Sequence, residues 1–128
     1  MKKRLLTLLT AIVCLGGMSA SAQAILKLEK TNHNFGKFNE DTPVTYIFKF
    51  TNTGDQPLVI HQAISSCGCT IPQFTKDPIQ PGKKGEIKVT YNGKGKYPGH
   101  FKKAITIRSN ASNKLVRLYI EGEMTEGK

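Results

Sequence analysis

The chain has 128 residues and a formal net charge of +10 at neutral pH. This length is enough for one modest hydrophobic core, so it excludes a large multidomain protein. The excess of basic residues suits an anionic partner, but the lysines are spread along the chain and do not cluster. Such spacing is typical of a small β protein whose lysines keep it soluble and protect its strand edges.

The first 22 residues have the pattern of a secretory signal peptide. Basic residues at 2–4 precede an apolar run at 5–15, and Ala20-Ser21-Ala22 supplies the small residues of a cleavage site. The apolar run is shorter than the roughly 20 residues of a membrane-spanning helix, which argues against a retained anchor. Residues 1–22 are therefore predicted to be removed together with Cys14, which leaves a periplasmic or secreted domain at residues 23–128. The net charge then falls from +10 to +7, because three basic residues leave and all nine acidic residues follow Ala22.

Period-two alternation of apolar and polar residues dominates the rest of the chain and predicts half-buried β-strands. Tyr46, Phe48 and Phe50, for example, alternate with polar side chains. No apolar set recurs at helical spacing, so no long helix is expected. The segments with strand-like alternation are 25–29, 44–51, 58–64, 86–91, 101–108 and 116–121, with a glycine-interrupted stretch around 35–38.

These segments predict an all-β fold: an immunoglobulin-like β-sandwich of about seven strands, with a small barrel as the alternative. The chain has no tryptophan, which excludes the Cys…Trp…Cys pattern of antibody domains. Turn-forming residues separate the strands. We assign structural turns to Asn52, Gly54, Pro57, Pro81 and Gly82.

Cys67 and Cys69, separated by Gly68, are the two cysteines left after the predicted cleavage. In an extended strand their Cα atoms would lie about 6.5 Å apart, near the upper limit for a disulfide. Gly68 would allow a tighter bend. Three interpretations stay open: a structural disulfide in an oxidising compartment, a redox-active dithiol, or two thiolates that bind a soft ion such as Cu(I).

A metal site would need a further ligand near the two cysteines. His61 shares the strand parity of Cys67 but lies about 20 Å away along an extended chain. His33 and His100 are interpreted as surface residues, and His61 likewise. No nucleophile-elbow, zinc-protease or phosphate-loop motif occurs in the chain. We therefore predict no enzyme activity, no cofactor and no metal.

The glycine-rich segment 93–99 is predicted to connect two strands, because no helix follows it to cradle a phosphate. Lys94, Lys96, Lys102 and Lys103 form a basic patch with Tyr97 only if this loop and the next strand lie together. An interleaved platform of aromatic residues on one face is missing, so no nucleic-acid partner is predicted.

Three segments carry a resemblance to a known family. They are 50–60 followed by Cys67-Gly68-Cys69-Thr70, then 81–91 and 99–110. Together they resemble the bacterial family called domain of unknown function 1573 over nearly the whole mature chain. That family is similar to the immunoglobulin-like domains of hydin and of abnormal-spindle proteins, and more distantly to major sperm protein and pilus chaperones. The resemblance implies a β-sandwich in an exported protein, and it supplies no activity.

These observations favour a non-catalytic, exported interaction module of the cell envelope. Such a module would bind a protein or glycan partner with its loops or with an exposed strand edge. No membrane span is expected once the signal peptide is removed. The alternative function is a thiol redox or Cu(I)-binding protein in which Cys67 and Cys69 are the reacting pair.

Overall fold

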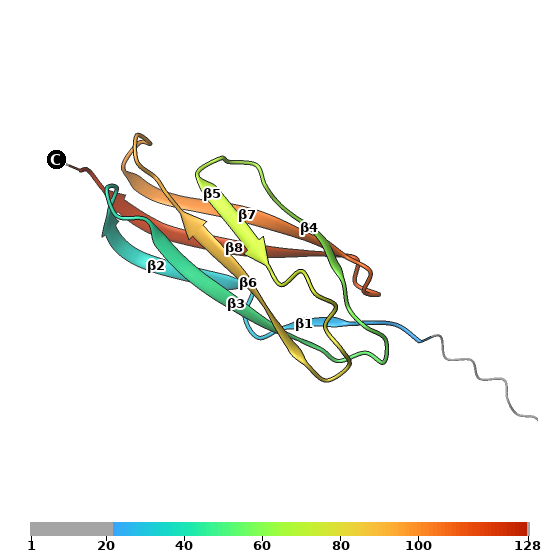
Figure 1. The fold of residues 1–128 in the computed structure, drawn as a ribbon. Helices are drawn as coiled ribbons and strands as arrows, with labels where there is room; N and C mark the ends of the chain where they lie inside the picture. Colours follow the sequence, from blue (N-terminus) through green and yellow to red (C-terminus); the bar gives the residue numbers. More distant parts are fainter. Residues whose placement is uncertain (1–21, 128) are drawn as a thin grey trace, which may run out of the picture.

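The structure, a computed structural model, describes residues 22–127 as eight β-strands joined by loops (Figure 1). The predicted signal peptide lies outside this range except for Ala22. No helix in the described range is long and apolar enough to cross a membrane. The strands are β1 (Leu26–Leu28), β2 (Asn32–Asn39), β3 (Val44–Asn52), β4 (Ile60–Ser65), β5 (Thr70–Phe74), β6 (Lys84–Tyr91), β7 (Gly99–Ser109) and β8 (Leu115–Thr125).

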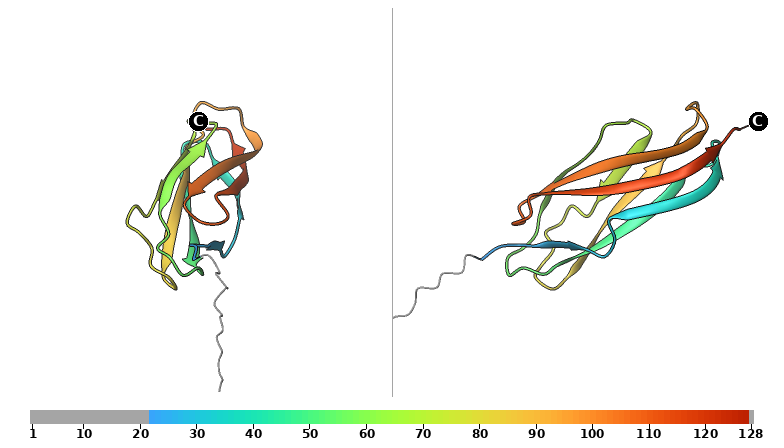
Figure 2. Two further views of the ribbon diagram at one scale, coloured as in Figure 1. Left: turned by 90° about the vertical axis from the view of Figure 1, so that its right-hand side faces the viewer. Right: turned by 180° about the vertical axis from the view of Figure 1, so that it is seen from behind.

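The strands form two four-stranded sheets that pack face to face (Figure 2). The strand order is β1-β3-β6-β5 in one sheet and β2-β8-β7-β4 in the other. All pairs are antiparallel except β2 with β8. This is the arrangement of an immunoglobulin-like sandwich, with β2 as an additional strand beside the last one. The predicted fold class is confirmed.

The eighth strand arises because the N-terminal stretch contributes to both sheets. β1 pairs with β3, and after residues 29–31 the chain switches to the other sheet, where β2 pairs with β8. Gly36 lies at an irregularity within β2 and adopts a φ of 73°, a conformation that favours glycine. The glycine-interrupted stretch around 35–38 is therefore part of a strand of its own.

The core lies between the two sheets and follows the alternation of the strands. Every second side chain of the central strands points inward, and those in the middle of the strands are fully buried. Each such side chain contributes about 1.5–3 kcal/mol of burial free energy. The largest buried apolar side chains of the central strands are Phe48, Phe50, Ile87, Val89, Ile105, Ile107, Leu118, Ile120 and Met124.

A β-bulge changes the direction of the side chains along β4. Ile60 pairs with Ser109 and Gln62 pairs with Arg108, so His61 is an extra residue on the β4 side. Simple alternation would place Ile60 and Ile64 on the same face. The bulge shifts the alternation by one residue. Ile60 is consequently buried, whereas Ile64 is 41% exposed on the outer face.

Candidate functional site

Cys67 and Cys69 lie in the turn that carries the chain from one sheet to the other. β4 is the outermost strand of its sheet, and β5 is the outermost strand of the opposite sheet. The two strands contact each other on the same side of the sandwich. Residues 66–69 therefore connect two free strand edges (Figure 1).

This turn brings the two cysteines closer than an extended strand would. Their Cα atoms are 5.1 Å apart and their sulfur atoms touch. The Thr70 amide donates to the Cys67 carbonyl (N···O 3.0 Å), and the Asn92 amide donates to the Cys69 carbonyl (2.8 Å). Gly68 does not adopt a left-handed φ. The close approach thus comes from the hydrogen-bonded turn, and the Cα separation suits a disulfide.

The two cysteines differ in their exposure to solvent. Cys69 is 5% exposed and belongs to the core, whereas Cys67 is half-buried. The Cys67 sulfur accepts a hydrogen bond from the Cys69 amide (3.1 Å), and the Thr70 hydroxyl lies 3.7 Å from the Cys69 sulfur. An incoming thiolate would therefore reach Cys67 first, because exchange requires access to the sulfur that is attacked.

The histidines sit in three different environments. His33 stacks on the ring of Tyr46, His61 is exposed on β4, and the His100 Nε2 lies 3.3 Å from the Glu121 carboxylate. Within residues 22–127, no three His, Cys, Asp or Glu side chains gather closely enough to hold a metal ion. A soft ion bound at the two cysteines would require their reduction to thiolates, because their sulfur atoms are in contact with each other.

The edge of β4 next to this turn presents backbone groups that its own sheet does not use. The Asn110 amide donates to the Val59 carbonyl, and the Ser109 amide donates to the Lys114 carbonyl. Even-numbered residues of β7 therefore bond to β4, and odd-numbered ones bond to β8. In the register of β4 with β7, this leaves the amide and carbonyl groups of Ala63 and Ser65 pointing away from the sheet.

The other three edges carry features that discourage strand pairing. β1 has only three residues and contains a lysine, and β2 contains Lys37 and an irregularity at Gly36. On β5, the bond from the Thr75 amide to the Glu86 carbonyl shows that Pro72 faces the free edge, where it has no N–H to offer. β4 carries no proline and no Lys, Arg, Asp or Glu. Among the four outermost strands that the structure describes, β4 alone lacks both proline and these charged residues, although it has the bulge at His61.

The sequence did not predict the open edge of β4, because neither the bulge in β4 nor strand β5 beside it follows simple alternation. Alternation predicts no strand after residue 65, whereas the structure has β5 there; Pro72 within β5 is typical of an edge strand. The bulge at His61, which turns Ile64 outward, has no composition signal of its own. Both features depend on the pairing of strands that are distant in sequence.

The predicted turn residue Asn52 lies fully buried at the end of β3. Its side-chain amide donates to the carbonyls of Gln56 (2.7 Å) and Ile79 (2.9 Å). Its side-chain oxygen accepts from the amides of Ile25 (3.2 Å) and Gly54 (2.9 Å). Asn52 thereby joins the N-terminal strand to two loops and satisfies its polar atoms in the core.

The other predicted turn residues lie in loops at the same end of the domain. Pro81 and Gly82 occupy the centre of a turn in which the Lys83 amide donates to the Gln80 carbonyl (2.9 Å). Gly82 has a φ of 81°, as a type II turn requires. Gly54 and Pro57 lie in the loop after β3, where the backbone at Gly54 touches the N-terminal segment.

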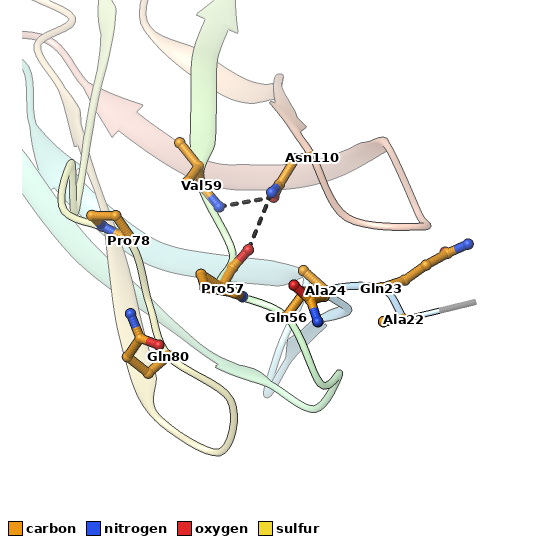
Figure 3. Close-up of a pocket in the computed structure, with 9 residues that line it drawn as sticks. All are labelled: Ala22, Gln23, Ala24, Gln56, Pro57, Val59, Pro78, Gln80 and Asn110. Atoms are coloured by element: carbon orange, nitrogen blue, oxygen red, sulfur yellow. Dashed lines mark hydrogen bonds between the residues drawn. The ribbon is translucent and has the colours of Figure 1, made fainter. Parts of the chain in front are cut away.

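A shallow groove of about 520 Å³ opens beside these loops (Figure 3). The Asn110 side chain closes one side of it by accepting from the Val59 amide (2.8 Å) and donating to the Pro57 carbonyl (3.1 Å). None of its lining side chains is titratable, so the groove offers no acid or base. The lining residues are Ala22, Gln23, Ala24, Gln56, Pro57, Val59, Pro78, Gln80 and Asn110.

The basic residues around 94–103 do not form one surface. Lys102 is exposed, and its Nζ lies 5.2 Å from the ring centroid of Tyr119 on the outer face. Lys103 follows it in β7 and is half-buried, because it shares the inward parity of Ile105. Tyr97 is 96% exposed in the loop before β7. The lysines of β7 therefore point to opposite faces of their strand.

Comparison with known families and proteins gives one match by sequence. A family model described as "Protein of unknown function (DUF1573)" matches residues 26–124. This range covers all eight strands except the last residue of β8. No curated protein matches the chain.

Several solved structures share the sandwich. A protein of unknown function from Porphyromonas gingivalis W83 has a TM-score of 0.71 at 17% identity, over 84% of this chain and 50% of that one. The ASH / PapD-like domain 7 of human CEP192 has a TM-score of 0.69 at 8% identity, over 94% and 99% of the two chains. The periplasmic chaperone SfaE has a TM-score of 0.55 at 10% identity, over 80% and 58%. At these identities the likeness shows the fold alone, and this chain spans about half of the first protein's length.

Proposed function

The chain belongs to the DUF1573 family, and on that premise we propose that it is an exported interaction module that binds an extended segment of an envelope protein along the edge of β4. The partner segment would add a fifth strand to the sheet β2-β8-β7-β4. This is strand addition, in which main-chain hydrogen bonds supply affinity and neighbouring side chains supply specificity.

The observation that carries this proposal is the open edge of β4. The amide and carbonyl groups of Ala63 and Ser65 point away from the sheet, and the strand carries no proline or charged acid or base. Each new main-chain hydrogen bond would contribute about 0.5–1.5 kcal/mol. Ile64, 41% exposed on the outer face, would pack against a side chain of the added strand.

The chemistry of this edge suits a peptide better than a glycan. A row of alternating amides and carbonyls matches the backbone of another extended chain, spaced at about 3.3 Å per residue. Sugars are bound mainly by side-chain hydrogen bonds and aromatic rings, and the side chains of β4 include no aromatic residue besides His61. We therefore commit to a protein partner.

Export is supported by the leader pattern at residues 1–22 and by the cysteine pair. A Cα separation of 5.1 Å and touching sulfur atoms suit a disulfide between Cys67 and Cys69. Such bonds persist in oxidising compartments such as the bacterial periplasm. Both features fit a periplasmic or secreted domain.

Photo-crosslinking in living cells tests the binding surface. A photoreactive amino acid replaces Ile64 on β4 or, as a matched control from the opposite sheet, Ile47 on β3; the two isoleucines are 41% and 40% exposed. Ile47 also lies beside an open edge, because β1 pairs only with residues 50–52 of β3, so this control compares the two edges. We expect a crosslinked protein from position 64 and none from position 47. The crosslinked peptide should lie in an extended segment of the partner.

The substitution Ala63→Pro in the position-64 background sharpens this test. Proline removes an amide that points to solvent, so the domain keeps its own ladder while the edge loses a donor. The crosslink should then disappear while the circular-dichroism spectrum stays that of a β protein. Equal crosslinking from positions 64 and 47, or a crosslink that survives Ala63→Pro, would count against the β4 edge.

A second candidate function is thiol exchange at Cys67, and the difference in exposure between the two cysteine residues favours it. Cys67 is the accessible member of the pair, and Cys69 is buried behind it. A partner thiolate would attack the Cys67 sulfur, a mixed disulfide would form, and Cys69 would leave as thiolate. Mass measurement after reduction, alkylation and glutathione treatment tests this. Thiols that neither exchange nor bind Cu(I) would rule out the thiol functions.

A further inference from the structure

Gln23 and Asp55 hold each other by two reciprocal hydrogen bonds. The Gln23 backbone nitrogen lies 2.8 Å from the Asp55 carboxylate oxygen Oδ1. In return, the Asp55 amide donates to the Gln23 carbonyl at 2.9 Å. Residues 23 and 55 are distant in sequence, and these two bonds hold the N-terminal segment against the loop after β3.

The chain is fixed to the domain from Gln23 onward. Ala24 is buried, and its carbonyl accepts from the Ser112 amide at 2.9 Å. A side chain at Gly54 would overlap the Gln23 carbonyl oxygen, so the backbones approach as closely as glycine permits. Ala22, by contrast, is exposed. Figure 3 shows Gln23 at the mouth of the groove, with its side chain directed away from the other lining residues.

Removal of residues 1–22 would change the chemistry of this contact. The Gln23 nitrogen would no longer be a neutral amide but an α-ammonium group with three N–H donors. A carboxylate already lies 2.8 Å from that atom. A hydrogen bond between two charged groups is stronger than one from a neutral amide, and capture of an N-terminal amine is a known recognition mode.

We propose that Asp55 is the binding site of the Gln23 α-ammonium group in the processed protein, and that this ion pair restrains Gln23 from cyclising to pyroglutamate. The proposal rests on the cleavage after Ala22 that is part of the proposed function. It is independent of whether β4 binds a partner.

Cyclisation is an intramolecular substitution that needs no co-reactant. The neutral α-nitrogen attacks Cδ of the Gln23 side chain, the N–Cδ bond forms, and the Cδ–Nε2 bond breaks. A proton moves from the α-nitrogen to the departing nitrogen, and ammonia leaves. The Asp55 carboxylate opposes this step because it stabilises the protonated α-nitrogen, which has no lone pair to attack with.

The experiment starts from the full-length precursor, expressed in a bacterium that exports it. Intact mass of the purified protein first reports which residue is N-terminal. Wild type, Asp55→Asn and the matched control Asp77→Asn, an exposed carboxylate outside this contact, are then incubated at neutral pH. Loss of one ammonia is followed by mass. Asn keeps an oxygen acceptor at residue 55, so the variant isolates the charge.

We expect Asp55→Asn to cyclise several-fold faster than wild type and Asp77→Asn. High salt should accelerate wild type in the same way, because the Debye length falls to about 3 Å at 1 M, and this second measurement does not depend on a variant. Equal rates in all three proteins, or no effect of salt, would overturn the proposal. Cleavage at another residue would overturn it while leaving export intact, whereas an uncleaved leader would count against export as well.

Discussion

The imidazole of His33 in β2 lies flat on the phenol ring of Tyr46 in β3, with ring centroids 3.7 Å apart and planes inclined by 11°. The stack closes one side of the sandwich, because β2 and β3 belong to opposite sheets. Burial lowers the pKa of His33 below its usual 6.5, and the nearby charge of Lys30 lowers it further. The folded domain therefore favours the neutral imidazole.

This stack predicts a loss of stability in mild acid. Since the folded-state pKa of His33 is lowered, its contribution is complete above the unfolded-state value and is lost as pH falls through the folded-state pKa. Between about pH 7 and about pH 5, the free energy of unfolding of wild type should therefore fall more than that of His33→Gln. Urea unfolding at a series of pH values measures this. His61→Gln, at an exposed position, should follow wild type.

The buried side chain of Asn52 predicts a large effect of a small substitution. Asn52→Ala would remove the side-chain partner of the Gln56 carbonyl and of the Ile25 and Gly54 amides, whereas the Ile79 carbonyl would keep its bond from the Leu58 amide. We expect the free energy of unfolding to fall by about 2–4 kcal/mol. Asn34→Ala, at an exposed position with one local hydrogen bond, serves as the control and should change it by less than about 0.5 kcal/mol. Similar losses for the two variants would contradict the role given to Asn52.

Two glycines predict opposite responses to alanine. A Cβ at Gly54 would overlap backbone atoms of residues 23–25, so Gly54→Ala must displace the N-terminal segment. A Cβ at Gly68 would meet no atom within 4 Å. Thermal unfolding should show a loss of more than about 2 kcal/mol for Gly54→Ala and a change within about 0.5 kcal/mol for Gly68→Ala. Tolerance of alanine at Gly54 would mean that the N-terminal segment is not held there.

A bond between Cys67 and Cys69 should matter little for global stability. It closes a ring of three residues, which removes little entropy from the unfolded chain. Reductant should therefore lower the free energy of unfolding by no more than about 2 kcal/mol. Urea unfolding with and without reductant measures this, and Cys67→Ser with reductant absent should match the reduced protein. Unfolding of the domain on reduction would show that the disulfide is required for its global stability.

The alternation of side chains was sufficient to predict the sandwich, since residues such as Phe48 and Phe50 depend only on their own strand to face inward. The number of strands was harder to predict from the sequence. Whether residues 25–39 form one strand or two depends on the switch between sheets at residues 29–31, and that switch is determined by pairing with β3 and β8. Pairing partners are distant in sequence, so local composition does not reveal them.

The candidate site was predictable only in part. Cys67 and Cys69 could be identified from composition, but the turn that brings them together is held to the rest of the domain by the hydrogen bond from the Asn92 amide, which is distant in sequence. The open edge of β4 depends on the bulge at His61 and on the register with β7. The contact of Asp55 could not be predicted, because its partner Gln23 is distant in sequence.

Hydrogen exchange of the β4 amides is the most direct test of strand addition. In the free domain, the amides of Gln62 and Ile64 should exchange slowly because they bond to β7, whereas those of Ala63 and Ser65 should exchange fast. With the crosslinked partner segment bound, Ala63 and Ser65 should become protected while the edge of β5 stays unchanged. Protection that appears in β5 or in the loops, with Ala63 and Ser65 still exchanging fast, would contradict the proposed binding edge.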